Sequence, residues 1–241
     1  MKSKTIVIVI VLLLSWGEAF TQGFDWQYSA RLPFNTPRFF IGLSGTADFT
    51  YSIATLPLLE NDYRLCCNLG DGTGFSGALG LNFEYWPGNY SIFLKVMYGY
   101  YRSGFSAQGE AYPIRGGGTL ISEYTVNTDM QRIILEPGAR FRLFGSYFRL
   151  DCSLRSSIIT KFTYDITDSE ADIGETYNPR IPDYNQIFLQ FNLGLSYDFS
   201  VGLGKYSSFG IYTALPVLGI SRTNEWLPIS IGATFTYNNG L

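Results

Sequence analysis

The segment Ser230-Ile231-Gly232-Ala233-Thr234-Phe235-Thr236-Tyr237 lies close to the end of the 241-residue sequence and alternates between two kinds of residue. Successive side chains of a β-strand point to opposite faces of the sheet. One face would carry Ile231, Ala233, Phe235 and Tyr237, and the other Ser230, Gly232, Thr234 and Thr236. The segment therefore predicts a β-strand with one apolar face and one polar face.

Seven further segments alternate in the same way, over 39–51, 75–85, 90–100, 131–143, 148–158, 186–199 and 207–215. Pro137 lies within one of them and cannot donate a ladder hydrogen bond. Because the alternation keeps its phase on both sides of Pro137, we expect one continuous strand with a local distortion. The sequence thus predicts an all-β fold of about eight strands.

The connections between these segments alternate in length. Short ones cover 86–89, 144–146 and 200–205, whereas longer polar ones cover 52–74, 101–130, 159–185 and 216–226. Short turns at one end and long loops at the other are typical of transmembrane up-and-down antiparallel β-barrels. Both termini would lie at the end that carries the short turns.

Three features indicate that the apolar face points outward, toward lipid. The apolar face carries no charge in the middle of any segment, and a midplane Lys or Arg facing lipid would cost roughly 2–4 kcal/mol. The polar face is rich in small residues such as Gly80, Gly138 and Gly194, which suit a narrow barrel interior. Aromatic residues mark both ends of the apolar face, as in the girdles at membrane interfaces. A soluble lipid-binding barrel with its apolar face inside is the alternative.

From Phe39 to Tyr237 the chain resembles the small outer-membrane β-barrel family, which includes OmpA- and OmpX-like barrels and PorT-like barrels. The terminal segment resembles the assembly signal of such barrels through Ser230, Gly232, Phe235 and Tyr237. The resemblance implies insertion by the barrel-assembly machinery, contact with outer-membrane lipid and a role at the surface or in the envelope. It places the long loops outside the cell and the termini in the periplasm.

The first residues resemble a Gram-negative-type export signal. Lys2 and Lys4 precede an apolar run over 5–14, and Gly17 and Ala19 are spaced for cleavage after Ala19. We therefore expect a signal peptide over 1–19, a periplasmic lead-in over 20–37 and the barrel over 38–241.

The composition argues against several classes of function. The sequence contains no His, which is the usual acid or base of hydrolases and transferases, so we expect no enzyme. We also expect no cofactor and no metal site, because the chain has only three Cys and no spaced acidic ligands. The formal net charge of −3 argues against a nucleic-acid partner.

The predicted lumen carries charges of both signs. The inward cations are Lys95, Arg132, Arg140, Arg142, Arg149 and Arg155, and the inward anions are Asp48, Glu84, Glu136, Asp151 and Asp198. Because unpaired charges are costly in a narrow interior, we expect Arg140, Arg142 and Arg149 to pair with Glu84, Glu136 and Asp151. Such pairing would plug the lumen and favour a scaffold over a pore.

Two states remain open for the adjacent Cys66 and Cys67. They either form a strained vicinal disulfide or stay as free thiols, because neighbouring Cα atoms lie about 3.8 Å apart, below the usual disulfide range. Cys152 falls on the phase that faces lipid.

We therefore expect an integral outer-membrane β-barrel, a non-enzymatic scaffold whose extracellular loops contact a surface or envelope partner. The alternatives are a PorT-like transport or secretion accessory, a narrow porin-like solute pore, and the soluble lipid-binding barrel.

The assembly signal gives a first prediction. Replacing both Phe235 and Tyr237 by Asp should leave the chain in the periplasm or degraded, because the terminal aromatics would no longer be presented to the assembly machinery. Heat-modifiable migration in gel electrophoresis measures the folded barrel, and normal migration of the double variant would refute the assignment.

Overall fold

The computed structural model describes residues 38–60, 63–87, 90–114, 118–143, 147–168, 184–202, 204–221 and 226–241. The expected signal peptide and lead-in, residues 1–37, lie outside these ranges, as do the side chains of Cys66 and Cys67. No helix in the described ranges has the length and hydrophobicity needed to cross a bilayer.

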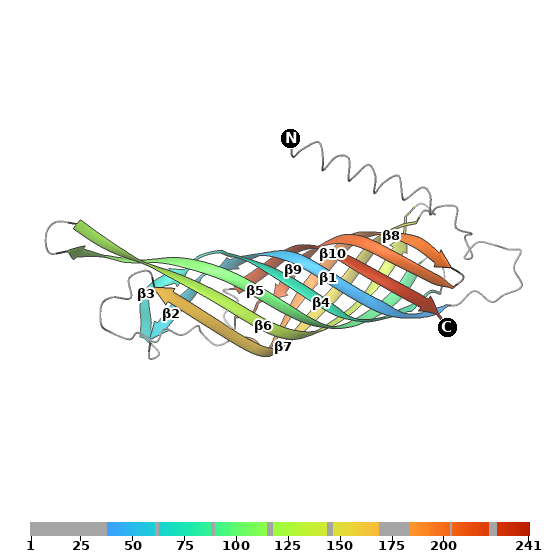
Figure 1. Ribbon diagram of the computed structural model, residues 1–241, viewed down its shortest axis with the longest axis horizontal. Coiled ribbons are helices and arrows are strands. Elements are labelled where there is room, and N and C mark those ends of the chain that lie inside the picture. Colours follow the sequence, from blue (N-terminus) through green and yellow to red (C-terminus); the bar gives the residue numbers. More distant parts are fainter. Residues whose placement is uncertain are drawn as a thin grey trace, which may run out of the picture.

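Eight antiparallel strands form a closed barrel, in the ring order β1-β10-β9-β8-β7-β6-β5-β4. Their bounds are β1 Phe39–Ala54, β4 Gly72–Tyr85, β5 Tyr90–Ile114, β6 Gly118–Arg142, β7 Phe148–Asp168, β8 Ile187–Gly202, β9 Lys205–Leu218 and β10 Trp226–Gly240. Each barrel strand pairs with the next barrel strand along the chain, so that β1 pairs with β4, and β10 closes the ring on β1. Figure 1 shows the barrel from the side, with the C-terminus at the end that carries the short connections. We call this the turn end, and the opposite one the loop end.

The strands are steeply tilted, as the register around the ring shows. One row of residues that lie opposite each other on successive strands runs through Thr50, Ser230, Ala214, Asn192, Ser153, Gly138, Phe93, Glu84 and Phe40. The row leaves β1 at Thr50 and returns to β1 at Phe40, nearer the turn end. A stagger of this kind is what lets a small number of strands close into a barrel. It also brings residues that are distant in sequence to the same height inside the lumen.

The long connections contain more strand than the sequence analysis predicted. The expected loop over 101–130 is largely the continuation of β5 and β6, which stay paired as far as Ile114 and Gly118. Inside the expected loop over 52–74 lies a small separate hairpin of β2, Leu56–Glu60, and β3, Tyr63–Leu69. The prediction of loops there is wrong because the outward residues become polar beyond the apolar band, so these parts of the strands lack the apolar face that marks the other strands.

Pro137 interrupts one ladder without changing its register, as expected for a residue without an N–H group. The pairs between β6 and β7 stop at Leu135 with Ser156 and resume at Gly138 with Ser153. On its other side, Pro137 remains opposite Leu94 of β5.

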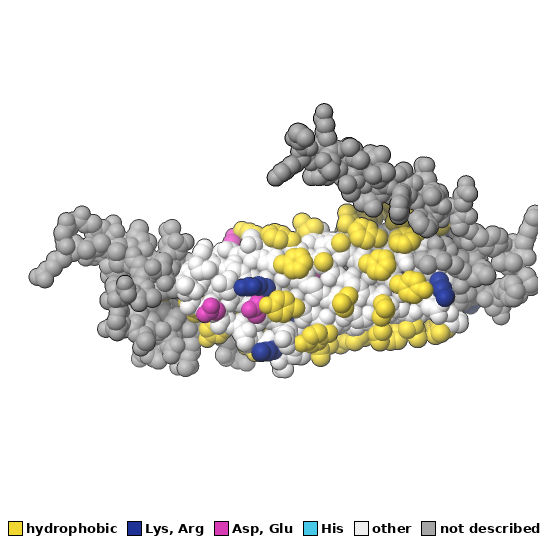
Figure 2. All heavy atoms as spheres, in the orientation of Figure 1, with side chains coloured by type: hydrophobic (Ala, Val, Ile, Leu, Met, Phe, Trp, Pro, Cys, Tyr) yellow, Lys and Arg dark blue, Asp and Glu magenta, His cyan; other side chains and the backbone are white. Residues whose placement is uncertain are grey.

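Apolar side chains cover the outside of the barrel, and charged side chains lie inside. Leu79 is 76% exposed and Ile231 is 65% exposed, whereas Arg140 is fully buried. Figure 2 shows the apolar side chains spread over the surface of the barrel wall. An outward apolar surface of this extent has to face lipid. The apolar-inside alternative is therefore excluded for the described strands, and the fold is that of a transmembrane up-and-down β-barrel.

Aromatic residues mark both ends of the apolar surface. The turn-end set consists of Phe39, Tyr85, Tyr90, Phe141, Phe148, Tyr197, Phe199 and Tyr237, and the loop-end set includes Tyr51, Phe75, Tyr98 and Tyr100. Neighbours in the first set lie against each other, as Phe39 and Tyr85 do with their ring centroids 4.6 Å apart. Such girdles belong at the two membrane interfaces.

The interior changes character along the barrel axis. At the loop end it holds an apolar cluster of Ala54, Leu69, Tyr101, Phe105, Val126, Met130, Ile159, Phe188, Ile220 and Trp226. The outward residues at this end are polar, such as Arg102 and Asp129. A register shift between β6 and β7, which leaves Thr160 as an extra residue, keeps Phe162 packed against this cluster. In this part of the barrel apolar side chains therefore face inward and polar side chains face outward, as in a water-soluble barrel.

Gly138 allows a close approach inside the barrel and gives the second prediction. A Cβ atom there would lie 2.5 Å from Cζ of Phe93 and 2.6 Å from Cβ of Ser153. Gly138→Ala should therefore destabilise the barrel by about 1–3 kcal/mol through overpacking. Urea unfolding of the full chain refolded in lipid vesicles measures the change.

The control is Gly77→Ala, because a Cβ atom at Gly77 would meet only the backbone oxygen of Thr46 at 3.6 Å. Equal unfolding midpoints for the two variants would contradict the packing argument.

Candidate functional site

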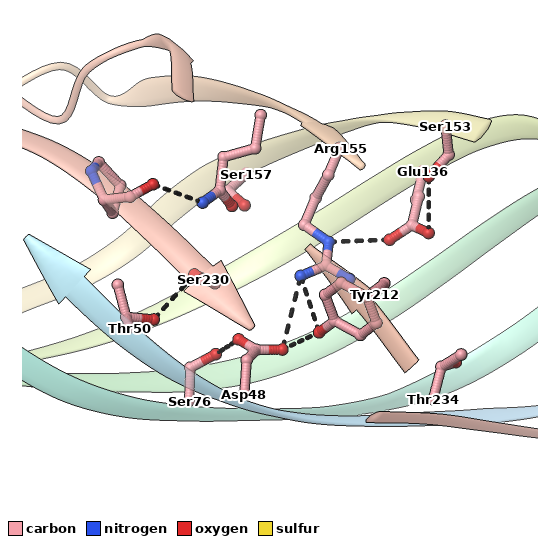
Figure 3. Close-up of polar contacts among 12 residues, drawn as sticks. Asp48, Thr50, Ser76, Glu136, Ser153, Arg155, Ser157, Tyr212, Ser230 and Thr234 are labelled. Carbon is pink, nitrogen blue, oxygen red and sulfur yellow. Dashed lines mark hydrogen bonds and ion pairs between the residues drawn. The ribbon is translucent and has the colours of Figure 1, made fainter. Parts of the chain in front are cut away.

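The middle of the lumen is built around Arg155 of β7, which lies between two carboxylates from other strands. Its Nε atom donates to Oε2 of Glu136 at 2.8 Å. Its Nη1 atom lies 3.6 Å from Oδ1 of Asp48, which comes from β1. Figure 3 shows Arg155 reaching from one wall of the barrel toward Asp48 on the other. A single guanidinium thereby links β7 to β6 and, across the lumen, to β1.

Asp48 gathers further donors around it. The hydroxyl groups of Ser76 and Tyr212 both donate to its carboxylate. The guanidinium of Arg132 lies 3.8 Å from Oδ2 and also donates to Ser76 at 2.8 Å. Burial of a carboxylate is tolerated when its oxygens are satisfied by charged and neutral donors in this way.

Glu136 is the second acceptor of this middle group. Lys95 lies 3.5 Å from its Oε1 atom, and Ser153 donates to the same oxygen at 3.0 Å. Both Lys95 and Glu136 are almost fully buried. The middle group therefore joins β1, β4, β5, β6, β7 and β9 through side chains alone.

A second group lies nearer the turn end and is centred on Glu84 of β4. Arg140 donates to its Oε2 atom at 3.0 Å, and Trp86 donates to Oε1 at 2.8 Å through Nε1. The hydroxyl groups of Ser91 and Tyr206 also donate to this carboxylate. Arg140 and Glu84 are both fully buried, so a charge-assisted hydrogen bond holds the pair in an environment that excludes water.

Two aspartates extend this second group. Arg140 Nε lies 3.4 Å from Oδ1 of Asp151. Arg149 forms an ion pair with Asp198 and lies 4.0 Å from Oε1 of Glu84. Arginine suits these positions because its planar fork can face two carboxylates at once.

An aromatic cluster closes the turn end of the lumen below these charges. Phe40, Trp86 and Tyr206 pack together, with ring centroids 5.2 to 5.6 Å apart. The guanidinium of Arg149 lies 3.7 Å from the ring centroid of Trp86, as in a cation–π contact. Arg142, expected among the lumen charges, is half-buried at the end of β6 with its guanidinium 5.9 Å from the same ring.

The loop end of the lumen is closed by the apolar cluster described above. Its polar groups are satisfied locally, because Ser52 hydrogen-bonds to Tyr101 at 3.0 Å and receives the Trp226 indole N–H at 3.2 Å. From one end to the other, the lumen thus contains an aromatic cluster, two ion-paired groups and an apolar cluster.

Several residues of the site were not identified from the sequence. The carboxylates accept hydrogen bonds from Tyr206, Tyr212, Ser76 and Trp86, none of which is among the predicted lumen charges. The inward phase of the segment over 207–215 contains Tyr212, and this signal could have identified it. Trp86 lies outside every alternating segment, so periodicity gives no information about it.

The expected assembly-signal residues lie in β10. Ser230 is buried and hydrogen-bonds to Thr50 at 2.8 Å, while Phe235 is exposed on the outside of the barrel. Gly232 and Tyr237 are half-buried. Their role in assembly stays a prediction.

The charged groups are suited to holding strands together. Among the described residues, no group of three or more His, Cys, Asp or Glu side chains is arranged to hold a metal ion. Each buried carboxylate of the two groups faces at least one arginine or lysine. Cys152 is half-buried within β7 and has a free thiol.

Comparison with known proteins gives likeness of fold only. No protein-family model matches the sequence, and no curated protein does. Ail, the attachment invasion locus protein of Yersinia pestis, solved with the heparin analogue sucrose octasulfate, is 13% identical with a TM-score of 0.38, over 83% of this chain and 99% of Ail. Ail is one of the structural neighbours of this chain that are small outer-membrane β-barrels.

Two further structural neighbours have similarly low sequence identity and TM-score. The outer membrane protease OmpT from Escherichia coli is 12% identical with a TM-score of 0.36, over 88% of this chain and 99% of OmpT. The outer membrane protein OprG from Pseudomonas aeruginosa is 11% identical with a TM-score of 0.35, over 86% of this chain and 95% of OprG.

Arg155 gives the third prediction. Arg155→Met should destabilise the barrel by about 3–5 kcal/mol, because it removes the cation between two buried carboxylates. Urea unfolding in lipid vesicles measures the loss. Arg102→Gln is the control, because Arg102 is exposed and lies 3.7 Å from Asp129, and an exposed pair contributes less than about 1 kcal/mol.

A double variant tests the mechanism. Glu136→Gln combined with Arg155→Met should cost less than the sum of the two single changes, because the residues share one ion pair. Strictly additive losses would show that the two side chains act independently.

Proposed function

We propose that this protein is a non-enzymatic scaffold of the outer membrane, which presents its long β5–β6 hairpin outside the cell to a surface or envelope partner. The observation that supports this function best is the contrast between a filled lumen and a hairpin that extends well beyond the barrel (Figure 1). The turn end and both termini would then face the periplasm.

The filled lumen argues against the narrow solute pore. A conducting pore needs a continuous path for water, and a barrel of about eight strands has space for little more than side chains. Here the two ion-paired groups cross the lumen, and aromatic or apolar side chains cover both ends. A solute could pass only if several buried pairs separated.

The β5–β6 hairpin is the part of the scaffold best placed for contacts. The pairing of β5 with β4 ends at Phe105, and the pairing of β6 with β7 ends at Tyr124. Beyond these residues the two strands continue to pair with each other up to Ile114 and Gly118. Binding function is often carried by connecting segments held on a rigid scaffold.

A non-enzymatic role agrees with the chemistry of the described side chains. The sequence has no His, and the buried carboxylates are engaged by arginine, lysine or tyrosine. A secretion accessory remains the alternative function, and the identity of the partner would distinguish the two.

The fourth prediction removes the hairpin. In the shortened variant, residues 107–124 are replaced by Asn-Gly, so that Ser106 and Thr125, which are paired in the structure, become the ends of a two-residue turn. The barrel should still show heat-modifiable migration, because both ion-paired groups and all ring pairs except that of Tyr124 with Asp168 are kept. Cross-linking in intact cells should lose a specific partner band.

The control shortens the connection over 169–183 instead. A partner band that disappears only from the hairpin variant supports the proposal. Identical cross-linked bands in all three proteins would refute it, and a steady large conductance of the full chain in planar bilayers would favour the pore.

A further inference from the structure

The pairing of β9 with β10 stops before either strand ends. Among the described residues of these two strands, the pair nearest the loop end is Ala214 with Ser230. Both strands continue beyond this pair. Farther toward the loop end, the N–H group of Ile220 donates to the carbonyl of Trp226 at 2.9 Å. We call the part of the wall between these two links, residues 215–218 and 227–229, the β9–β10 window.

Two prolines account for this break in the ladder. If the register of the Ala214–Ser230 pair continued, Pro216 would lie opposite Pro228. The carbonyl of Pro228 accepts a hydrogen bond at 3.0 Å from the side-chain amide of Gln190, which belongs to β8 on the far side of β9. Because the N and O atoms of one strand residue point toward the same neighbour, Pro228 also lacks its N–H group on the side of β9. The two prolines therefore remove both donors of one ladder pair.

A break in a lipid-facing ladder is significant because hydrocarbon offers no substitute for a lost backbone hydrogen bond. The prolines reduce the number of donors that need a partner, and Gln190 satisfies the carbonyl of Pro228. A register shift between β8 and β9 also leaves Val217 as an extra residue, and such a bulge bends its strand. The local sequence thus interrupts the ladder and limits the number of backbone groups left without a partner.

The outside of the window belongs to the lipid-facing surface. Leu215 is 49% exposed and Val217 is 62% exposed, and the residues of the window include no charged one. Ile229, which is half-buried, pairs with Tyr51 of the loop-end girdle. Aromatic girdles lie at the membrane interfaces. The window therefore borders the hydrocarbon of the leaflet at the loop end, close to its headgroups.

The lumen behind the window is apolar as well. Trp226 and Ile220, which border the window, both belong to the buried apolar cluster of the loop end. The ladder break at Pro137 is different, because Glu136 and Arg155 form an ion pair on its lumen side. At the window, an apolar ligand would meet apolar side chains all the way from the membrane to the lumen.

We propose that the β9–β10 window is a binding site for a single hydrocarbon chain, which enters sideways from the membrane and packs against Trp226 and Ile220. The window extends over about four residues of one strand, or roughly 13 Å, and it is only one missing ladder wide. This long and narrow shape suits an unbranched chain. A polar ligand would find no charge there, and the amide nitrogen of Gln190 already donates to Pro228.

The bound chain would stay at the loop end of the lumen. The ion pairs of Arg155 with Glu136 and Asp48 cross the lumen on the turn-end side of the apolar cluster. They would have to separate before a chain could pass farther, so the window is a binding site and not a channel. It is also independent of the contacts proposed for the β5–β6 hairpin.

The test uses the full chain refolded into phosphatidylcholine vesicles and two photoreactive probes. One probe is phosphatidylcholine with a diazirine in an acyl chain, and the other is a free fatty acid with the same group. After illumination, mass spectrometry maps the labelled residues. Outward residues such as Leu79 should be labelled in any barrel, whereas label on Trp226 and Ile220 requires a chain inside the window. Met97, which is buried in the lumen behind unbroken ladders, gives the background.

The variant Pro216→Thr/Pro228→Thr restores the two N–H groups, so that β9 and β10 can pair through the window. Label on Trp226 and Ile220 should then fall to the level found at Met97. Heat-modifiable migration shows whether the variant is folded. If the double variant does not fold, Pro216→Thr alone serves as the test, because it also restores a donor that faces β10.

The matched control is Pro137→Thr, which restores a donor at the other ladder break and should keep the label on Trp226 and Ile220. Such label from either probe supports the proposal, and the probe that gives it identifies the source of the chain as membrane lipid or free fatty acid. Persistence of the label in the variant that restores the ladder, its loss in the control or equal label at Met97 would each overturn the proposal. A wild-type protein without inward label that a cross-linker traps as a dimer would also overturn it, because a second copy would then cover the window.

Discussion

The link between Arg155 and its two carboxylates is the interaction on which the interior of this barrel depends. A closed ring of strands satisfies its backbone groups by itself, but it does not determine what fills the lumen. Arg155 joins Glu136 of a neighbouring strand to Asp48 on the far wall. Moving such an ion-paired group out of water costs free energy. Removing one of its members destabilises the protein strongly, because the remaining charge is then buried without a partner. The stagger of the strands brings these residues to one height in the lumen. The register of the strands is therefore consistent with the ion pairs inside the barrel.

The alternation of side chains along each strand determines both the residues on the outer surface and those in the lumen. Because side chains alternate along a strand, every residue that covers the outside fixes its neighbours on the inside. In the membrane-spanning part, Leu94 and Val96 face lipid while Lys95 is buried. Toward the loop end the same strand places Arg102 outside and Tyr101 inside. The environment changes from lipid to water, and the contents of the two faces change with it.

Much of this arrangement could be predicted from the sequence, because period-two alternation reports directly on strand phase. The barrel, the number of its strands and the burial of residues such as Arg140 and Glu84 all follow from that phase. The continuation of β5 to Ile114 could not be predicted by seeking an apolar outer face, because beyond the membrane that face is polar. Trp86 was also missed, since it follows the end of β4 and turns back over the lumen, where tertiary contacts with Glu84 and Arg149 decide its place.

The division of the lumen into a charged part and an apolar part restricts how the strands can slide past each other. In a barrel with a uniform interior, a slip of one strand by two residues preserves the in–out alternation and costs little. Here such a slip of β6 would move Arg132 to the level of Met130, inside the apolar cluster, and would draw Glu136 away from Lys95. Each such slip would separate charges and bury a polar group in apolar surroundings. The contents of the lumen therefore select one alignment of the eight strands, which backbone hydrogen bonds alone would leave open.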